Sequence, residues 1–133
     1  DAFRRRRCLI VADGFYEWRQ VGSRKVPMWI HRASHRPFTF AGIWERWQPP
    51  EGEPIFSCAI ITTEANDALR PIHERMPVIL PPEDRAKWLD PDADPETLLG
   101  LLRPYPGDDL RAHTVSTLVN SPRNDLPECI EPV

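Results

Sequence analysis

The chain has 133 residues, of which 41% are hydrophobic and 28% charged, and a formal net charge of -3 at pH 7. This composition predicts one globular domain, residues 1–133, and argues against a protein that coats nucleic acid through overall positive charge. No apolar run approaches the roughly 20 residues that cross a bilayer, and no signal-peptide pattern is evident. We therefore expect a cytoplasmic protein without membrane contact.

The pattern of residues predicts strands joined by many turns, with few helices. Short apolar and aromatic runs between Gly and Pro residues predict strands at 8–11, 15–19, 27–32, 38–44, 55–62, 76–80 and 110–119. Helices are predicted at 65–70, before a proline, at 82–89, and at 94–102, where Asp94 is a plausible N-cap. The expected class is α+β, with a mainly antiparallel sheet.

An arginine run opens the chain at Arg4, Arg5, Arg6 and Arg7. Clustered arginines bind phosphates by releasing counterions, so this run is a candidate contact for a nucleic-acid strand. From charge alone, a solvated basic tail is the simpler interpretation of the same residues.

The predicted strand at 15–19 carries a carboxylate among aromatic residues. Strand alternation places Phe15 and Glu17 on one face, and Tyr16 and Trp18 on the other. A carboxylate held against an apolar surface suits proton transfer, which makes Glu17 a candidate acid or base. The competing interpretation is a solvated glutamate at a sheet edge, with Trp18 serving the core.

Two further candidates lie at the ends of apolar strands. Thr62 and Thr63 end the strand 55–62, where hydroxyls hold a phosphate or simply cap the next helix. His73 belongs to a His-Glu-Arg triplet before the strand 76–80, a position that faces a cleft if the strand mouth is open. A structural histidine is the simpler alternative.

The three cysteines, Cys8, Cys58 and Cys129, are widely spaced and form no CxxC pair. Neither a disulfide framework nor a zinc site is indicated, and we expect a reducing compartment and no metal.

Five blocks, taken in order, resemble the SRAP family, the SOS-response-associated peptidases. They are RRCLIVADGFYEW at 6–18, PFTFAGIWERW at 37–47, SCAIITTEAN at 57–66, IHERMPVIL at 72–80 and VSTLVN at 115–120. Each block alone is weak evidence, but five in the family's order cover nearly the whole chain.

The resemblance implies a curved, barrel-like antiparallel sheet and a positively charged groove for single-stranded DNA that contains abasic sites. It implies a nucleoid-associated role in DNA repair and the SOS response, with no cofactor. In the family, an N-terminal cysteine forms a thiazolidine with the abasic aldehyde. By position, Glu17 and His73 match the proton-transfer residues and Thr62 a pocket residue, while Trp18 and Arg4 to Arg7 are DNA-contact candidates.

The chain begins with Asp1, and none of its cysteines lies at the N-terminus. We therefore expect an N-terminally truncated SRAP domain that is inactive alone, with a sheet edge left open to dimerisation or aggregation. Two alternatives stay open, a passive single-stranded DNA-binding module and an autopeptidase or small hydrolase that uses Glu17 and His73. The sequence does not determine the oligomeric state.

Overall fold

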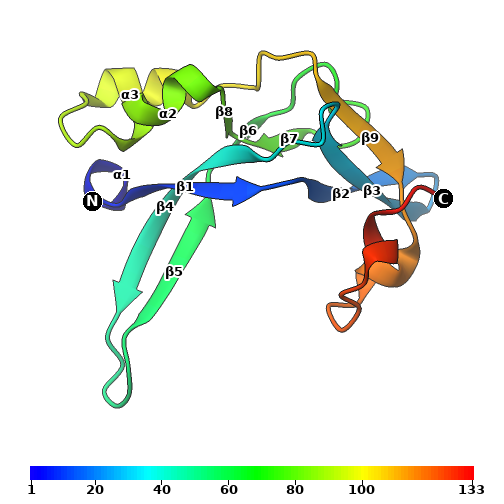
Figure 1. Ribbon diagram of the computed structural model, residues 1–133, viewed down its shortest axis with the longest axis horizontal. Helices are drawn as coiled ribbons and strands as arrows, with labels where there is room; N and C mark the ends of the chain where they lie inside the picture. Colours follow the sequence, from blue (N-terminus) through cyan, green and yellow to red (C-terminus); the bar gives the residue numbers. More distant parts are fainter.

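The computed structural model describes residues 1–133 and contains three antiparallel sheets with short helices around them (Figure 1). The largest sheet has the order β1-β4-β5, and β8 also pairs with β4. Its strands are β1 (Arg7–Ala12), β4 (Phe38–Trp47), β5 (Ile55–Ile60) and β8 (Ile79–Leu80). Strand β5 lies at an edge of this sheet.

The second sheet has the order β2-β3-β9, and a small third sheet pairs β6 with β7. These strands are β2 (Phe15–Val21), β3 (Arg24–Arg32), β9 (Leu110–Thr114), β6 (Thr62–Glu64) and β7 (Arg75–Pro77). Gly22 has φ 62° in the turn between β2 and β3, a conformation that glycine adopts without strain.

Two apolar clusters hold the sheets and helices together. One includes Ile30, Phe38, Phe40 and Met76 and lies where the sheets meet. The other is centred on Trp88, which is 0% exposed and donates from Nε1 to the Cys8 carbonyl at 2.9 Å. Trp88 belongs to α2 (Pro82–Leu89), which with α3 (Pro95–Leu101) covers one face of the β1–β4 pair.

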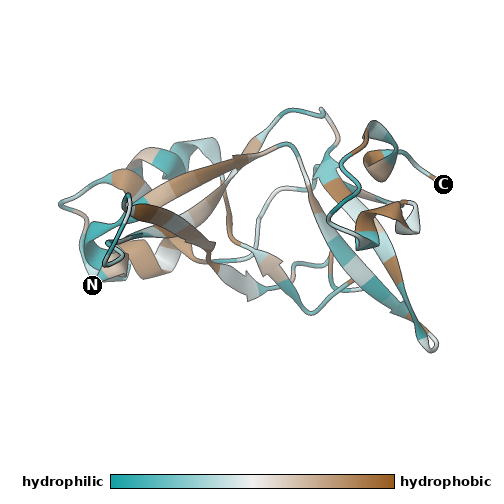
Figure 2. Ribbon diagram, turned by 90° about the horizontal axis from the view of Figure 1, so that it is seen from below, coloured by the Kyte–Doolittle hydropathy of each residue, from teal (hydrophilic) through white to brown (hydrophobic).

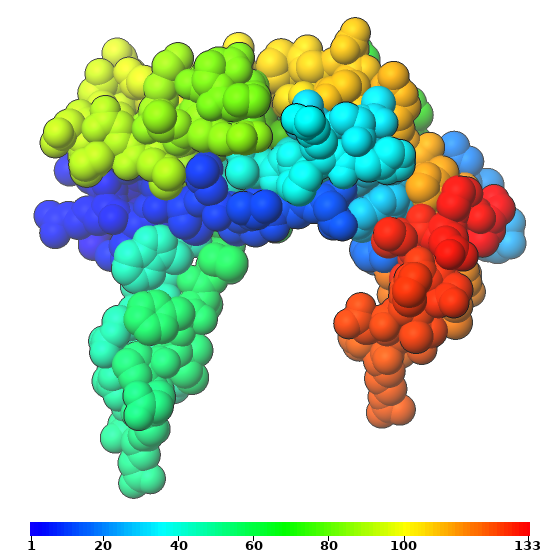
Figure 3. All heavy atoms as spheres, viewed as in Figure 1, coloured from blue at the N-terminus to red at the C-terminus, as the bar shows by residue number.

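The molecule is an arch. The β4–β5 hairpin projects from one end, and the C-terminal segment with the 3₁₀ helices η1 (Thr117–Asn120) and η2 (Pro127–Ile130) projects from the other. Figure 3 shows an open hollow between these two arms. Figure 2 shows hydrophobic residues concentrated on the strands toward the N-terminal end.

A polar network ties the loop before β9 to β3. Asp109 accepts hydrogen bonds from the Tyr105 hydroxyl at 2.7 Å and from Arg32 Nε at 2.9 Å. Burial disfavours ionised Asp109, but these hydrogen bonds outweigh it and hold its pKa below the usual value. Burial, followed by the hydrogen bond to Asp109, raises the pKa of Tyr105 to about 12.

The α+β class and the antiparallel arrangement are confirmed, although the sheets do not close into a barrel. The helices expected at 82–89 and 94–102 are present, and Asp94 caps α3 by accepting from Thr97 N–H at 2.8 Å. Helix α1 (Ala2–Arg5) was not expected. No helix of the structure has the length and apolar character needed to span a membrane.

The helix expected at 65–70 is wrong, because that segment forms turns. Asn66 Oδ1 accepts from Leu69 N–H at 3.0 Å, and Asn66 Nδ2 donates to the Tyr105 carbonyl at 3.0 Å. These side-chain bonds compete with helical bonding, and Pro71 blocks further extension.

Two expected strands are divided between sheets. The strand at 55–62 breaks at Ile61, and the strand at 76–80 breaks at Val78. Ile61 N–H donates to Ala41 O, Ala41 N–H to Val78 O, and Val78 N–H to Ile61 O. This ring of bonds is where the chain leaves one sheet and enters the next. The strand expected at 110–119 ends at Thr114, and η1 follows.

Candidate functional site

Strand β2 positions the candidate carboxylate. Phe15 packs edge-on against Phe40 in the core, whereas Tyr16 packs on Trp29 on the opposite face of the sheet. The expected alternation is therefore present, and Glu17 follows Phe15 toward a cavity that both residues line. The Glu17 side chain is 25% exposed, so it is partly shielded but reachable from solvent.

The candidate histidine comes from the turn before β7. His73 N–H donates to the Leu69 carbonyl, which fixes the turn. His73 Nδ1 lies 3.2 Å from both the N–H and the carbonyl oxygen of Arg75, so it accepts from the first or donates to the second according to the tautomer. The other ring nitrogen, Nε2, is 3.8 Å from Glu17 Oε1. The structure thus brings Glu17 of β2 together with His73 of the turn before β7.

An open groove surrounds this pair. Its larger part has a volume of about 850 Å³ and is lined by Glu17, Trp18, His73 and Asn120, among others. Trp18 Nε1 donates to Asn120 Oδ1 at 2.8 Å, which holds the indole at the groove wall. Lys25 and Arg70 line the same groove together with the carboxylates of Glu17 and Glu74. Arg70 also pairs with Asp67 at 2.7 Å.

Thr62 lies in a second part of the groove, with a volume of about 290 Å³, that also contains Glu17 and His73. Arg75 Nη2 donates to both the Thr62 carbonyl and Oγ1 at 3.0 Å. A single guanidinium therefore fixes the threonine beside the pair.

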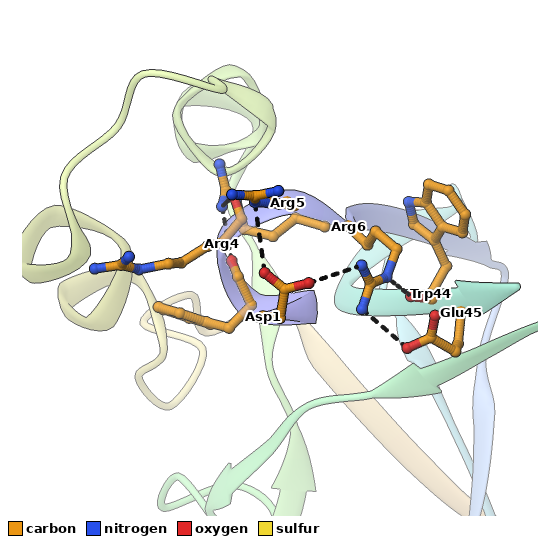
Figure 4. Close-up of polar contacts among 8 residues, drawn as sticks. Asp1, Arg4, Arg5, Arg6, Trp44 and Glu45 are labelled. Carbon is orange, nitrogen blue, oxygen red and sulfur yellow. Dashed lines mark hydrogen bonds and ion pairs between the residues drawn. The ribbon is translucent and has the colours of Figure 1, made fainter.

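The arginine run lies elsewhere, around α1, which Figure 1 places toward the opposite end of the molecule from β2. Arg6 donates to the Trp44 carbonyl at 3.2 Å and to Glu45 at 2.9 Å (Figure 4). Arg5 pairs with Asp1 at 3.4 Å on the surface.

Arg7 is bound still more closely to the protein. Its guanidinium donates to the carbonyls of Trp88, Phe3, Arg4 and Asp90 at 2.6 to 2.8 Å. The Arg4 side chain, by contrast, makes no hydrogen bond or ion pair. The arginine run therefore lies away from the Glu17–His73 groove. The side chains of Arg6 and Arg7 are hydrogen-bonded to other parts of the fold.

Lys25, Arg70, Arg75 and Asn120 are groove or wall residues that sequence reasoning did not select. Arg75 belongs to the His-Glu-Arg triplet, and Asn120 ends the VSTLVN block, so both carried a usable signal. Lys25 and Arg70 have polar neighbours in the sequence and belong to no distinctive motif.

The three cysteines lie outside the groove. Cys58 is exposed, Cys129 is buried, and Cys8 is half-buried. Burial, followed by the nearby Cys58, raises the pKa of the Cys8 thiol. No group of three or more His, Cys, Asp or Glu side chains is placed to hold a metal ion.

The model of the family described as "SOS response associated peptidase (SRAP)" matches residues 1–122. The chain is 50% identical to abasic site processing protein YoqW of Bacillus subtilis over 128 residues, which are 95% of this chain and 57% of that protein. It is 40% identical to abasic site processing protein HMCES of Gallus gallus over 149 residues, 96% of this chain and 44% of that protein.

A crystal structure of a protein from Bacteroides thetaiotaomicron superposes with a TM-score of 0.90 at 30% sequence identity. The match covers 99% of this chain and 59% of that one. The chain therefore spans less than two thirds of the length of each of these relatives.

Proposed function

This chain belongs to the SRAP family, and on that premise we propose that it supplies the proton-transfer half of a site that processes abasic sites in single-stranded DNA. The observation that carries the proposal is the approach of His73 Nε2 to Glu17 Oε1 at 3.8 Å inside an open groove. At 3.8 Å the two groups are not hydrogen-bonded, but a carboxylate and an imidazole that face one groove suit general acid–base chemistry, in which such contacts tighten when substrate binds. The relatives named as abasic site processing proteins support the same role.

The proposed chemistry needs an amine and a thiol on one N-terminal cysteine, a residue that is not among these 133. The neutral α-amine adds to the aldehyde carbon of the abasic sugar, and loss of one water gives an imine. The thiol then adds across the C=N bond, with sulfur on carbon and the proton on nitrogen, and closes a five-membered thiazolidine. The product is a covalent link between protein and DNA.

Glu17 and His73 transfer the protons in these reaction steps. Glu17 takes a proton from the attacking amine and returns it as water leaves. His73 protonates the ring oxygen of the closed sugar and so helps to open it to the reactive aldehyde. Thr62, fixed by Arg75, lines the same cavity, and its hydroxyl is our candidate for a hydrogen bond to the sugar. Reversal uses the same groups in the opposite direction.

The open groove favours a single strand over a duplex, because a splayed sugar must reach the Glu17–His73 pair. Trp18 offers an aromatic face at the groove wall for base stacking. Lys25 and Arg70 offer charge to the phosphates despite the net charge of -3. Arg4 keeps a free guanidinium and is the strongest DNA-contact candidate of the arginine run, while Arg5, Arg6 and Arg7 are weaker ones.

The test compares this chain with a longer protein that carries an upstream segment beginning with cysteine. Each is incubated with a single-stranded oligonucleotide that contains one abasic site and is then resolved on a denaturing gel. We expect a shifted band only with the longer protein. Glu17→Gln should slow its appearance by about 100-fold, the scale of one lost acid or base.

Glu64→Gln is the matched control, because Glu64 is an exposed carboxylate on β6 outside the groove. It should leave the cross-linking rate unchanged. If the folded longer protein gives no shifted band, and this chain binds intact and abasic strands equally well, passive DNA binding is the better account. Peptide cleavage that disappears in His73→Ala would favour the hydrolase instead.

A further inference from the structure

Three aromatic side chains form a row on the face of the β2–β3 pair that lies opposite Phe15. Trp29 is 9% exposed and packs on Tyr16 with ring centroids 4.9 Å apart, and Tyr16 packs on Trp18 at 6.3 Å. The C-terminal segment lies over the row, where the Tyr16 hydroxyl donates to the Cys129 carbonyl at 3.2 Å. Trp18 is the last member and lines the groove. The row therefore ends in a ring that forms part of the groove wall.

The one polar atom of this ring is already hydrogen-bonded. Trp18 Nε1 donates to Asn120 Oδ1 at 2.8 Å, and a tryptophan side chain has no other donor or acceptor. What the indole offers to the groove is consequently its aromatic surface. Such a surface stacks on any nucleobase, because every base has a π-face, but it does not read base edges through hydrogen bonds. The ring is therefore suited to hold a base without selecting its identity.

The backbone that carries Asn120 is itself held in place. Asn120 ends η1, whose Leu118 carbonyl accepts from Asn124 Nδ2 at 2.8 Å. At the start of the same segment, Val115 is 2% exposed and its N–H donates to the Pro27 carbonyl of β3 at 3.1 Å. The Asn120 amide is thus presented from a fixed position, and it fixes the indole in turn.

We infer that Asn120 is a positioning residue, which holds the indole of Trp18 as a stacking platform for the base next to an abasic site. The inference rests on the proposed function for the presence of a DNA strand in the groove. An abasic sugar at the Glu17–His73 pair has no base of its own, so a base on Trp18 comes from a neighbouring nucleotide. Because Glu17 and Trp18 are consecutive and both line the groove, the sugar and the base are held side by side.

A cation lies on the same face as the platform. Lys25 is opposite Gln20 in the β2–β3 register, and Trp18 is two residues before Gln20, so the side chains of Lys25 and Trp18 lie on one face of the hairpin. Both residues line the groove. The Lys25 ammonium supplies charge for the phosphate of the stacked nucleotide. Aromatic stacking beside a positive charge is the combination that binds single strands without sequence preference.

The contribution of Asn120 is to order the ring before DNA binds. A side chain that must become ordered during binding loses rotational freedom, and this loss weakens affinity about 2- to 10-fold for one side chain. With the hydrogen bond in place, the Trp18 ring is already ordered in the unbound protein. Loss of the bond should therefore weaken the binding of a base and leave the binding of a strand without bases unchanged.

The experiment measures how much a single base adds to DNA binding by this chain, with fluorescence anisotropy at constant ionic strength. One probe is a single strand made only of tetrahydrofuran residues, which are abasic and carry no aldehyde. The other is the same strand with one central adenine. Wild type should bind the second probe about tenfold more tightly, on the scale of one stacked base. Asn120→Ala should reduce this ratio to about threefold or less.

Three further variants separate positioning from a general structural role. Asn120→Asp keeps the accepting oxygen and should keep the wild-type ratio, although its charge weakens the binding of both probes. Trp18→Phe has no indole N–H, so adding Asn120→Ala to it should change the ratio no further. Trp47→Ala is the matched control, because Trp47 is a 57% exposed tryptophan on β4 outside the groove, and it should also keep the ratio.

Several results would overturn the inference. They are a ratio near one in wild type, an unchanged ratio in Asn120→Ala, and a ratio that falls in Asn120→Asp or in Trp47→Ala. Since neither probe carries an aldehyde, the ratio does not depend on cross-linking by a longer protein. A tenfold ratio without any shifted band on the denaturing gel would refute the proposed chemistry alone, and a shifted band with a ratio near one would refute the stacking platform alone.

Discussion

Replacement of Arg7 tests whether the arginine run serves the fold or a DNA strand. The Arg7 guanidinium donates four hydrogen bonds to backbone carbonyls and lies 5.6 Å from the ring centroid of Trp88. It thereby joins the start of β1 to the end of α2. In Arg7→Ala the carbonyls lose a charged hydrogen-bond donor, and α2 loses its side-chain bond to β1.

The loss of stability in Arg7→Ala is estimated from the hydrogen bonds that are least exposed to solvent. Those to the Trp88 and Phe3 carbonyls are partly buried, and the other two are exposed. A hydrogen bond to a charged group contributes about 1.5 kcal/mol at the low end of its range, so the two partly buried bonds give about 3 kcal/mol. For a chain of this length that loss lowers the melting temperature by about 10 °C.

The assay is urea unfolding followed by tryptophan fluorescence, with Arg4→Ala as the control because the Arg4 side chain has no partner. Arg4→Ala should change the free energy of unfolding by no more than about 0.5 kcal/mol. Arg7→Lys keeps the charge but lacks the planar fork, and should lose most of the same stability. Equal stabilities for Arg7→Ala and Arg4→Ala would refute this reasoning and return Arg7 to the surface-charge interpretation.

Further predictions concern pH and glycine positions. The lowered pKa of Asp109 contributes stability above the unfolded-state value of about 3.9, which is lost as pH falls through the lower folded value. Urea unfolding of Asp109→Asn should therefore show a shallower loss of stability in acid than wild type. A Cβ at Gly14 would overlap the indole of Trp29, so Gly14→Ala should destabilise by about 1–3 kcal/mol in thermal melts. Gly100 lies within α3 with open space around it, and Gly100→Ala should stabilise by up to about 1 kcal/mol; a result of the opposite sign at either glycine would contradict the packing described.

Strong local signals predict their elements correctly. The Pro and Asp signals at 82–89 and 94–102 predicted α2 and α3, and alternation along 15–19 predicted the two faces of β2. The helix expected at 65–70 failed because the bonds of Asn66 to Leu69 and Tyr105 depend on a loop that is distant in sequence.

The candidate site divides in the same way. Residue types and block order alone selected Glu17, His73 and Thr62, because these signals are written locally in the chain. Only the tertiary structure set His73 Nε2 3.8 Å from Glu17 Oε1 and gave Thr62 its guanidinium partner. The tertiary structure also determines that Arg7 bonds to the Trp88 carbonyl. A local stretch of sequence contains no information on which distant group its charged side chain will meet. The sequence by itself determines which chemical groups this protein has. The packing of segments that are distant in sequence determines which of those groups lie close together.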